Sequence, residues 1–419
     1  MTRNLKPNTI LFIPDAHYLS DPIYTRLAAN KIEKFNYFYF LTNFPMNFVQ
    51  RYESSKIDQK LFDKIYIQNN PNKEFLFSII YKANLKYKIK NLIKFIKLYK
   101  FYRKEVYNTL NELSPSIIVA TTDMLLINRD IYKWALSKKI PFVVYQSAFL
   151  ESPHYNFTTN VKNYLYRICF NRLLNIPLGR YNNLYGNEFK DSYLFLWGEY
   201  FKKDYNSKKA DDKIKYVGNP YYEEIIARSK FNINRIMSDL PKENLNILIC
   251  TNDLTGFLTK EEIEKIFTIY QKAIIENPNH HFIFKIHPGE SEQKYESLFN
   301  KEKVKNYSVE TKQTMTQLLG YAHIQVSIGS LTSFEAILSG IPIIIINSKL
   351  LKIADHFNDK LDEKVYNYDE FNKKISFMNS ASVYESFLLK REDYINKLMQ
   401  LDSVTRFNNT IKQILNNEL

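Results

Sequence analysis

Short apolar runs alternate with helical segments along most of the chain, and this alternation limits the fold more than any other feature. TILFIP predicts a first strand, and PIYTRLAANKIEKF, which follows it, has the spacing of a helix. The same order recurs in the second half, where the expected strands are LNILICTND, HHFIFKIHP, YSVE, IQVSIGS and IPIIIIN. Apolar strands separated by helices indicate parallel sheets covered on both faces. We therefore expect an α/β protein.

The length of 419 residues exceeds one ordinary core and predicts two domains. We expect an N-terminal Rossmann-like domain over residues 1–225, a second one over residues 240–375, and helices over residues 376–419 that pack back across both. The two domains would face a central cleft, and ligands would bind beyond the carboxyl ends of the strands. The segment ARSKFNINRIMSDLPKEN is expected to be an irregular connector.

The net charge of +14 favours an anionic partner. Residues 82–104 contain nine Lys or Arg and no acid, with apolar residues at helical spacing at positions Leu85, Ile89, Leu92, Ile96 and Tyr99. Such a helix can lie on an anionic membrane surface, or it can be an ordinary solvated helix whose apolar stripe packs inward. The sequence has no RRM signature, zinc finger or arginine cluster, so nucleic acid is not an expected partner.

The two cysteines make a disulfide framework or a cysteine zinc site unexpected. The apolar stretch before Pro14 is too short for a signal peptide, and no run reaches the roughly 20 apolar residues of a spanning helix. We expect the cytoplasm, with the inner face of the membrane as a possible site of attachment. The first glycine is Gly179, so the chain before it has neither a G-x-G-x-x-G turn nor a Walker loop.

A serine-rich turn is the strongest candidate for a ligand site. In IQVSIGSLTSFEAILSGIPIIII, residues 324–346, we expect a strand to end at Ser327, Gly329 to allow a tight turn, and a helix to begin near Ser333. Ser330 or Thr332 can cap that helix, and its first-turn N–H groups and dipole suit a phosphate. A plain helix cap is the alternative. The candidate binding residues are Ser327, Gly329, Ser330, Thr332, Ser333 and Glu335, with Glu335 in the first turn, where it could bind a ribose.

A strand that ends in a charged, rigid corner is the second candidate. In HFIFKIHPGES the apolar strand is interrupted by Lys285 and followed by His287 and Pro288. Pro288 fixes the backbone, so His287 can donate to a phosphate or a base, and Lys285 adds positive charge. A simple turn is the alternative.

The serine turn, followed by FEA and SGIP, resembles the donor corner of GT-B glycosyltransferases. Together with KIHP and YVGNPYYEEI it is similar to bacterial surface-polysaccharide enzymes: sialyltransferases with a His-Pro motif, Kdo transferases and CDP-glycerol glycerophosphotransferases. The motifs span residues 214–347. The resemblance implies a GT-B fold, a nucleotide-activated sugar as donor, and a surface glycan or lipid-linked acceptor. The position eight after Glu335 is Ile343, where retaining enzymes often carry a second glutamate, so inversion is expected.

The acceptor side is expected in the first half. FIPDAHYLSDPIYTRLA loosely resembles the stretch where inverting GT-B enzymes carry a catalytic base, although Ala16 replaces the usual glycine. His17 is the first candidate base, with Asp15 or Asp21 to orient it. The competing candidates at other strand ends are Asp123, Glu151 and His154. Loop capping by Asp15 beside a solvent-facing His17 is the structural alternative.

No D-x-D triplet occurs in the chain, so a metal ion is not expected, nor is any other cofactor. The favoured function is an inverting, metal-independent glycosyltransferase. A polyol-phosphate transferase that uses a CDP-alcohol is the second enzyme hypothesis, and a sugar-nucleotide epimerase is a third. A non-catalytic assembly protein of the polysaccharide machinery is the alternative from a different class.

Overall fold

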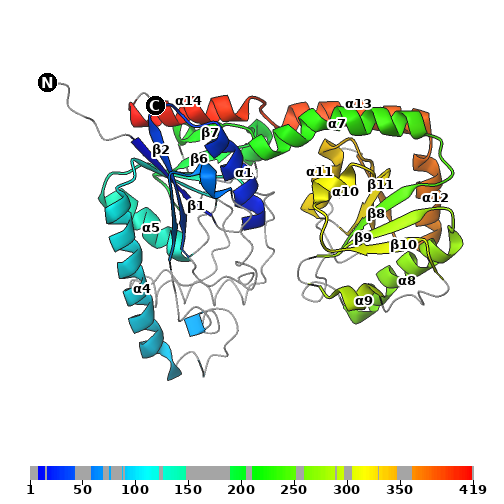
Figure 1. Ribbon diagram of the computed structural model, residues 1–419, viewed down its shortest axis with the longest axis horizontal. Coiled ribbons are helices and arrows are strands. Elements are labelled where there is room, and N and C mark those ends of the chain that lie inside the picture. Colours follow the sequence, from blue (N-terminus) through cyan, green and yellow to red (C-terminus); the bar gives the residue numbers. More distant parts are fainter. Residues whose placement is uncertain are drawn as a thin grey trace. The chain divides into compact units, whose positions relative to one another are not determined.

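The computed structural model describes residues 8–14, 17–42, 58–68, 75–76, 87, 90–121, 126–147, 189–203, 210–251, 259–287, 290–296, 304–328, 330–346 and 361–417 (Figure 1). The chain forms two compact units. The first comprises Met1–Tyr221 and Leu398–Leu419, and the second comprises Tyr222–Lys397. The chain therefore returns to its first unit at the C-terminal end.

The first unit is built on a seven-stranded parallel sheet of order β3-β2-β1-β4-β5-β6-β7. Its strands are β1 (Asn8–Ile13), β2 (Phe35–Leu41), β3 (Lys64–Ile67), β4 (Ile117–Ala120), β5 (Phe142–Tyr145), β6 (Tyr193–Leu196) and β7 (Ile214–Tyr216). Its helices are α1 (His17–Ala29), α4 (Leu92–Leu113), α5 (Leu126–Ser137) and α14 (Ser403–Leu415), with short 3-10 helices at Gln59–Leu61, Glu199–Lys203 and Asp211–Lys213.

The C-terminal helix α14 completes the core of the first unit. The ring of Phe407 lies 5.9 Å from that of Phe195 on β6 and 6.4 Å from that of Phe12 on β1. The GNP turn after β7 lies against the returning chain: Gly218 has a φ of +77°, and a Cβ there would collide with the carbonyl oxygen of Gln400. A side chain at this position is excluded both by conformation and by space.

The second unit contains a six-stranded parallel sheet of order β10-β9-β8-β11-β12-β13. Its strands are β8 (Asn246–Cys250), β9 (His281–Lys285), β10 (Tyr307–Glu310), β11 (Ile324–Ser327), β12 (Ile343–Ile346) and β13 (Asp362–Val365). Its helices are α7 (Pro220–Asp239), which starts just before the unit, α8 (Lys260–Glu276), α9 (Glu292–Glu296), α10 (Met315–Leu319), α11 (Leu331–Leu338), α12 (Tyr368–Met378) and α13 (Ala381–Leu398).

The two faces of the second sheet differ in character. Ile249, Phe284 and Val326 point to the face that packs against α8 and α12, where the large apolar core lies. Because side chains alternate along a strand, Cys250, Lys285 and Gln325 belong to the other face. Polar groups on the sheet therefore concentrate on the side away from this core.

Two sequence expectations for these elements need correction, and one strand was not expected at all. Residues 227–239 of the segment expected as an irregular connector form the end of the 20-residue helix α7, and residues 240–244 follow as a loop. The buried positions of α7 include Ser229 and Asn232, which interrupt the apolar pattern that would have marked a helix. β13 is an edge strand of sequence DEKV, without the apolar run that identified the other strands. Of the stripe expected in α4, Tyr99 is buried, Leu92 and Ile96 are only half-buried, and Leu85 and Ile89 lie outside the described residues. The buried residues of α4 are Phe95, Tyr99, Tyr102, Val106, Leu110 and Leu113.

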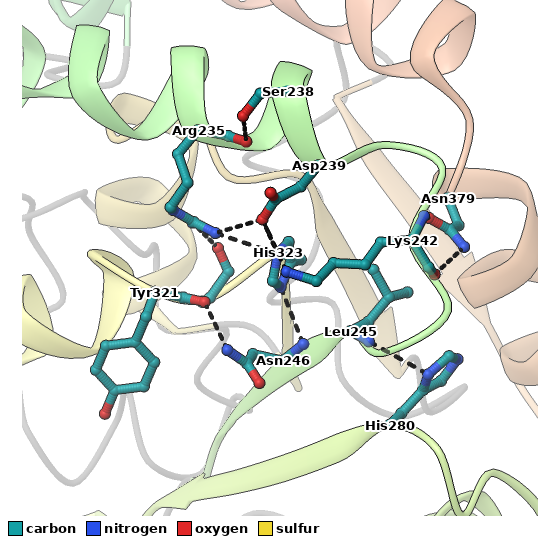
Figure 2. A network of polar contacts seen from close by, with 11 residues as sticks. Arg235, Ser238, Asp239, Lys242, Leu245, Asn246, His280, Tyr321, His323 and Asn379 are labelled. Atoms are coloured by element: carbon teal, nitrogen blue, oxygen red, sulfur yellow. Dashed lines mark hydrogen bonds and ion pairs between the residues drawn. The ribbon is translucent and has the colours of Figure 1, made fainter.

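A network of polar contacts around buried His323 lies at the amino-terminal edge of the second sheet (Figure 2). His323, at the start of β11, is 2% exposed, and its Nδ1 accepts a hydrogen bond of 2.9 Å from the backbone N–H of Asn246 on β8. The ring proton therefore lies on Nε2, which donates to Asp239 at 3.1 Å. Lys242 also reaches Asp239, at 2.9 Å. The network ties the end of α7 to two strands.

This network predicts a loss of stability in mild acid. Burial lowers the pKa of His323 below the ordinary value of 6.5, so below that pH the unfolded chain binds a proton that the folded chain binds less readily. The free energy of unfolding should therefore fall between pH 7 and pH 5. His323→Asn keeps an acceptor for Asn246 and should flatten this slope in chemical denaturation. An unchanged slope would show that other groups cause the acid sensitivity.

Candidate functional site

The centre of the second sheet is the place where its strand order reverses. β8 has β9 on one side and β11 on the other, and in sheets of this order ligands bind beyond the carboxyl ends at this crevice. Cys250 pairs with Lys285 in the sheet register, and Ile249 pairs with Val326, which places Ser327 beside Cys250. Strand spacing then separates the backbones at Lys285 and Ser327 by roughly 10 Å. The two predicted corners therefore lie on either side of the point where the strand order reverses.

The backbone of the His-Pro corner is held by Thr251, the residue after β8. Its hydroxyl accepts a hydrogen bond of 2.8 Å from the backbone N–H of His287, and its own N–H donates to the carbonyl of Lys285 at 3.1 Å. His287 itself is half-buried, and Pro288 lies outside the described residues. The histidine is thus tied to the neighbouring strand by its backbone.

The carboxylate of Glu290 stabilises this arrangement through hydrogen bonds. Its side chain is 3% exposed, and its carboxylate accepts hydrogen bonds from Thr251 Oγ1 at 2.5 Å, Lys294 Nζ at 2.8 Å and Tyr295 at 2.7 Å. A buried carboxylate needs several donors, and these three supply them. Sequence reasoning missed both Thr251 and Glu290. The only signal was a carboxylate directly after the His-Pro-Gly sequence.

The ammonium group of Lys285 lies on the polar face of the sheet. It donates to the carbonyl of Gln313 at 2.7 Å, which ties β9 to the loop before α10. The side chain is therefore held in place by this bond, and it contributes a fixed positive charge near the carboxyl edge of the sheet.

The serine corner caps α11 with Ser330. The helix begins at Leu331, and the Ser330 hydroxyl accepts from the backbone N–H of Thr332 at 3.3 Å. Ser327 and Ser333 are fully buried and share a hydrogen bond of 2.6 Å, which pins the start of the helix to β11. Gly329 lies outside the described residues.

Glu335 does not lie in the first turn of α11, contrary to the sequence expectation. The helix begins earlier than expected, at Leu331, so Glu335 falls in the second turn and the first turn carries no acid. The amino end of the helix keeps the positive end of its dipole without a first-turn carboxylate to oppose it. This favours an anionic ligand at that end.

Two residues of the long helix α13 bind the opposite end of α11. Arg391 of α13 is 8% exposed and donates to the carbonyls of Ile337 and Leu338 at 2.7 and 2.5 Å. Tyr384 donates to the carbonyl of Gly340 at 2.8 Å. Burial lowers the pKa of Arg391 to about 10, which still leaves the guanidinium charged at neutral pH. A fixed positive charge at the carboxyl end complements the helix dipole and holds α11 in position.

The pKa of Cys250 is affected by the charged side chains of both neighbouring elements. Burial raises the pKa of its thiol to about 11, Glu335 adds to the rise, and Lys285 opposes it. Glu335 on α11 and Lys285 on β9 therefore both act on the same buried sulfur. The thiol is protonated at neutral pH and is not a nucleophile.

The first sheet has the same reversal between β1 and β4. His17 is the first residue of α1, just beyond β1. Asp21 follows one turn later and is buried, and its carboxylate accepts a hydrogen bond of 2.6 Å from Tyr39. The remaining acceptor-side candidates lie outside the described residues: Asp15, Asp123, Glu151 and His154.

The described part of the chain lacks two further features. It contains no cluster of three or more His, Cys, Asp or Glu side chains suited to a metal ion. None of its helices is long and apolar enough to cross a membrane.

Comparison with known proteins places the chain by fold. No family model matches it, and no curated protein sequence matches it significantly. Among solved structures, the glycotransferase of kitacinnamycin is 10% identical with a TM-score of 0.57, covering 98% of this chain and 100% of that one. The UDP-GlcNAc 2-epimerase from Neisseria meningitidis bound to UDP-GlcNAc is 12% identical with a TM-score of 0.56, covering 98% and 100%.

The wall teichoic acid polymerase TagF, soaked with CDPG, is 11% identical with a TM-score of 0.55, covering 99% of this chain and 90% of that one. Identities this low show a shared architecture and not a shared reaction. The two parallel Rossmann-like sheets, the terminal helices and these likenesses together give the chain the GT-B fold that its motifs implied.

Proposed function

We propose that the chain is an inverting, metal-independent glycosyltransferase that moves a sugar from a nucleotide-activated donor to a bacterial surface glycan or lipid-linked acceptor. The observation that carries this proposal is the polar row Lys285–Cys250–Ser327 at the reversal point of the second sheet. Two elements suited to a nucleotide phosphate lie on either side of it: the His287 corner and the amino end of α11. The solved structures with the same fold include proteins bound to UDP-GlcNAc and soaked with CDPG.

On the donor side, the departing nucleotide carries negative charge that the protein must neutralise. The amino end of α11, with Ser330 and Thr332, would receive the phosphates, and His287 would donate to one of their oxygens. Lys285 adds charge from within the sheet, and Glu335 would accept from the ribose. Ser327 and Ser333, which bond to each other, would hold α11 in place for this task.

On the acceptor side, His17 is the proposed general base, with Asp15 as its orienter. It would take the proton of an acceptor hydroxyl as that oxygen attacks the anomeric carbon from the face opposite the leaving nucleotide. Asp21 is the weaker choice as orienter because its carboxylate accepts from Tyr39. Asp123, which follows β4, is the competing base.

A polyol-phosphate transferase is the second candidate, and the likeness to TagF favours it specifically. Such an enzyme would place the same corners around a CDP-alcohol, but the bond that breaks would be in the diphosphate and not at an anomeric carbon. Incubation with a panel of nucleotide sugars and with CDP-glycerol, followed by product analysis, separates the two. Release of CMP with transfer of glycerol phosphate would support the second candidate.

The binding role of His287 can be tested by calorimetric titration with UDP and CDP. A hydrogen bond to a charged oxygen contributes about 1.5–3 kcal/mol, so His287→Ala should weaken the affinity roughly 10- to 150-fold and lower kcat/KM by a similar factor. His281→Ala is the matched control, because His281 lies at the other end of β9 and bonds to Ser308. If wild type, His287→Ala and His281→Ala all bind UDP and CDP with equal affinity, His287 does not bind the nucleotide.

Thr251→Val tests whether the His-Pro corner depends on its neighbouring strand. The change keeps the shape of the side chain but removes the acceptor for His287 and a donor to buried Glu290. We expect a loss of about 1–3 kcal/mol in the free energy of unfolding, and a weaker nucleotide affinity. Thr268→Val, at an exposed hydroxyl on α8, is the control and should change neither quantity. Normal affinity in Thr251→Val would mean that the corner is held by other contacts.

His17→Ala should differ in kind from the donor-side variants. Loss of a general base slows turnover roughly 100- to 10,000-fold, while the donor site is untouched. We therefore expect nucleotide release in the presence of acceptor to collapse, with UDP and CDP affinities unchanged. If the variant keeps its turnover, His17 is not the base, and Asp123 becomes the first candidate.

A further inference from the structure

The outer face of α4 carries apolar side chains where a solvated helix would have none. Phe95, Tyr99 and Val106 are buried against the first unit, while Ile93 and Phe101 are 72% and 65% exposed. These two residues are eight positions apart, slightly more than two turns, so they project from the same side of the helix. Neither residue belongs to the apolar stripe expected from the sequence, which runs through Leu92, Ile96 and Tyr99.

Three exposed lysines share this face. Lys97, Lys100 and Lys104 fall between or just beyond the two apolar residues at helical spacing, and all three are exposed. No acid occurs between Leu92 and Lys104, and the acids Glu105 and Glu112 follow only in the second half of the helix. The outer face of α4, defined by Ile93, Lys97, Lys100, Phe101 and Lys104, is therefore both cationic and apolar.

The helix cannot turn this face inward, because its opposite side is anchored. Tyr99 donates to the buried carboxylate of Asp130 on α5 at 2.5 Å, and Arg103 Nη1 lies 3.8 Å from the same carboxylate. Asp130 is fully buried, so removing these contacts would leave its carboxylate buried without these partners, which is energetically costly. The packing thus fixes the outer face toward the surroundings.

We propose that the outer face of α4 is a docking surface for an anionic lipid bilayer. Lysines attract acidic headgroups, and an isoleucine and a phenylalanine that project between them can enter the boundary of the acyl chains. Nucleic acid would use the lysines but offers no apolar layer for Ile93. The inference is independent of the proposed reaction, since it concerns a different surface and is tested by binding alone.

Sedimentation with vesicles tests the proposal. The full chain should bind vesicles that contain a third phosphatidylglycerol in phosphatidylcholine, and binding should weaken as salt is raised. Each lysine contributes about a fivefold gain in partitioning, so the triple variant Lys97→Gln, Lys100→Gln, Lys104→Gln should lose on the order of 100-fold. The triple variant Lys138→Gln, Lys139→Gln, Lys412→Gln removes the same charge from exposed positions elsewhere in the first unit and should change binding little.

The apolar part has its own readout. The double variant Ile93→Ser, Phe101→Ser keeps every charge and should still lower partitioning at least tenfold, with the melting temperature retained because both side chains are exposed. Phe101→Trp should show a blue-shifted tryptophan emission when anionic vesicles are added. The proposal is overturned if the wild-type protein does not bind anionic vesicles at low salt or binds neutral vesicles equally well. It is also overturned if the control triple variant loses as much binding as the α4 triple variant. Tighter binding to a DNA duplex than to anionic vesicles would also overturn it.

Discussion

The candidate site depends on one constraint of the second sheet: β8 lies between β9 and β11, and all three parallel strands end at the same edge. Two segments far apart in sequence, the His-Pro corner and the serine corner, are brought to the same edge of the sheet by this order alone. No contact between the two corners is needed for this, because the strand spacing sets their separation. The first sheet repeats the order and brings the residues after β1 and β4 to an equivalent position.

The rigidity of the site comes from groups that do not point into it. Thr251 binds the backbone N–H of His287, and Glu290 in turn accepts a hydrogen bond from the Thr251 hydroxyl. Arg391 and Tyr384 hold the carboxyl end of α11, so that its amino end has a fixed direction. A site that must neutralise charge gains from such support, because dipoles that are already oriented cost no reorganisation when the ligand binds.

Local patterns in the sequence predicted much of this fold, but features that depend on contacts between distant residues could not be predicted. The apolar strands and the cap at Ser330 were predictable because their chemistry lies within a few residues. The end of α7 was misread because Ser229 and Asn232 occupy buried positions for reasons that lie in other elements: Ser229 accepts from Arg391, and Asn232 donates to the carbonyl of Ser339. Thr251 and Glu290 are 39 residues apart, and only the folded sheet makes them partners. The exposure of Ile93 and Phe101 depends in the same way on which side of α4 meets α5.

The most direct test of the account is a crystal structure of the chain with UDP or CDP bound. The account predicts that the diphosphate lies at the amino end of α11, bonded to Ser330 or to the first N–H groups of the helix, with the ring of His287 donating to a phosphate oxygen. A nucleotide at the opposite edge of the second sheet, or one whose phosphates contact neither corner, would contradict it.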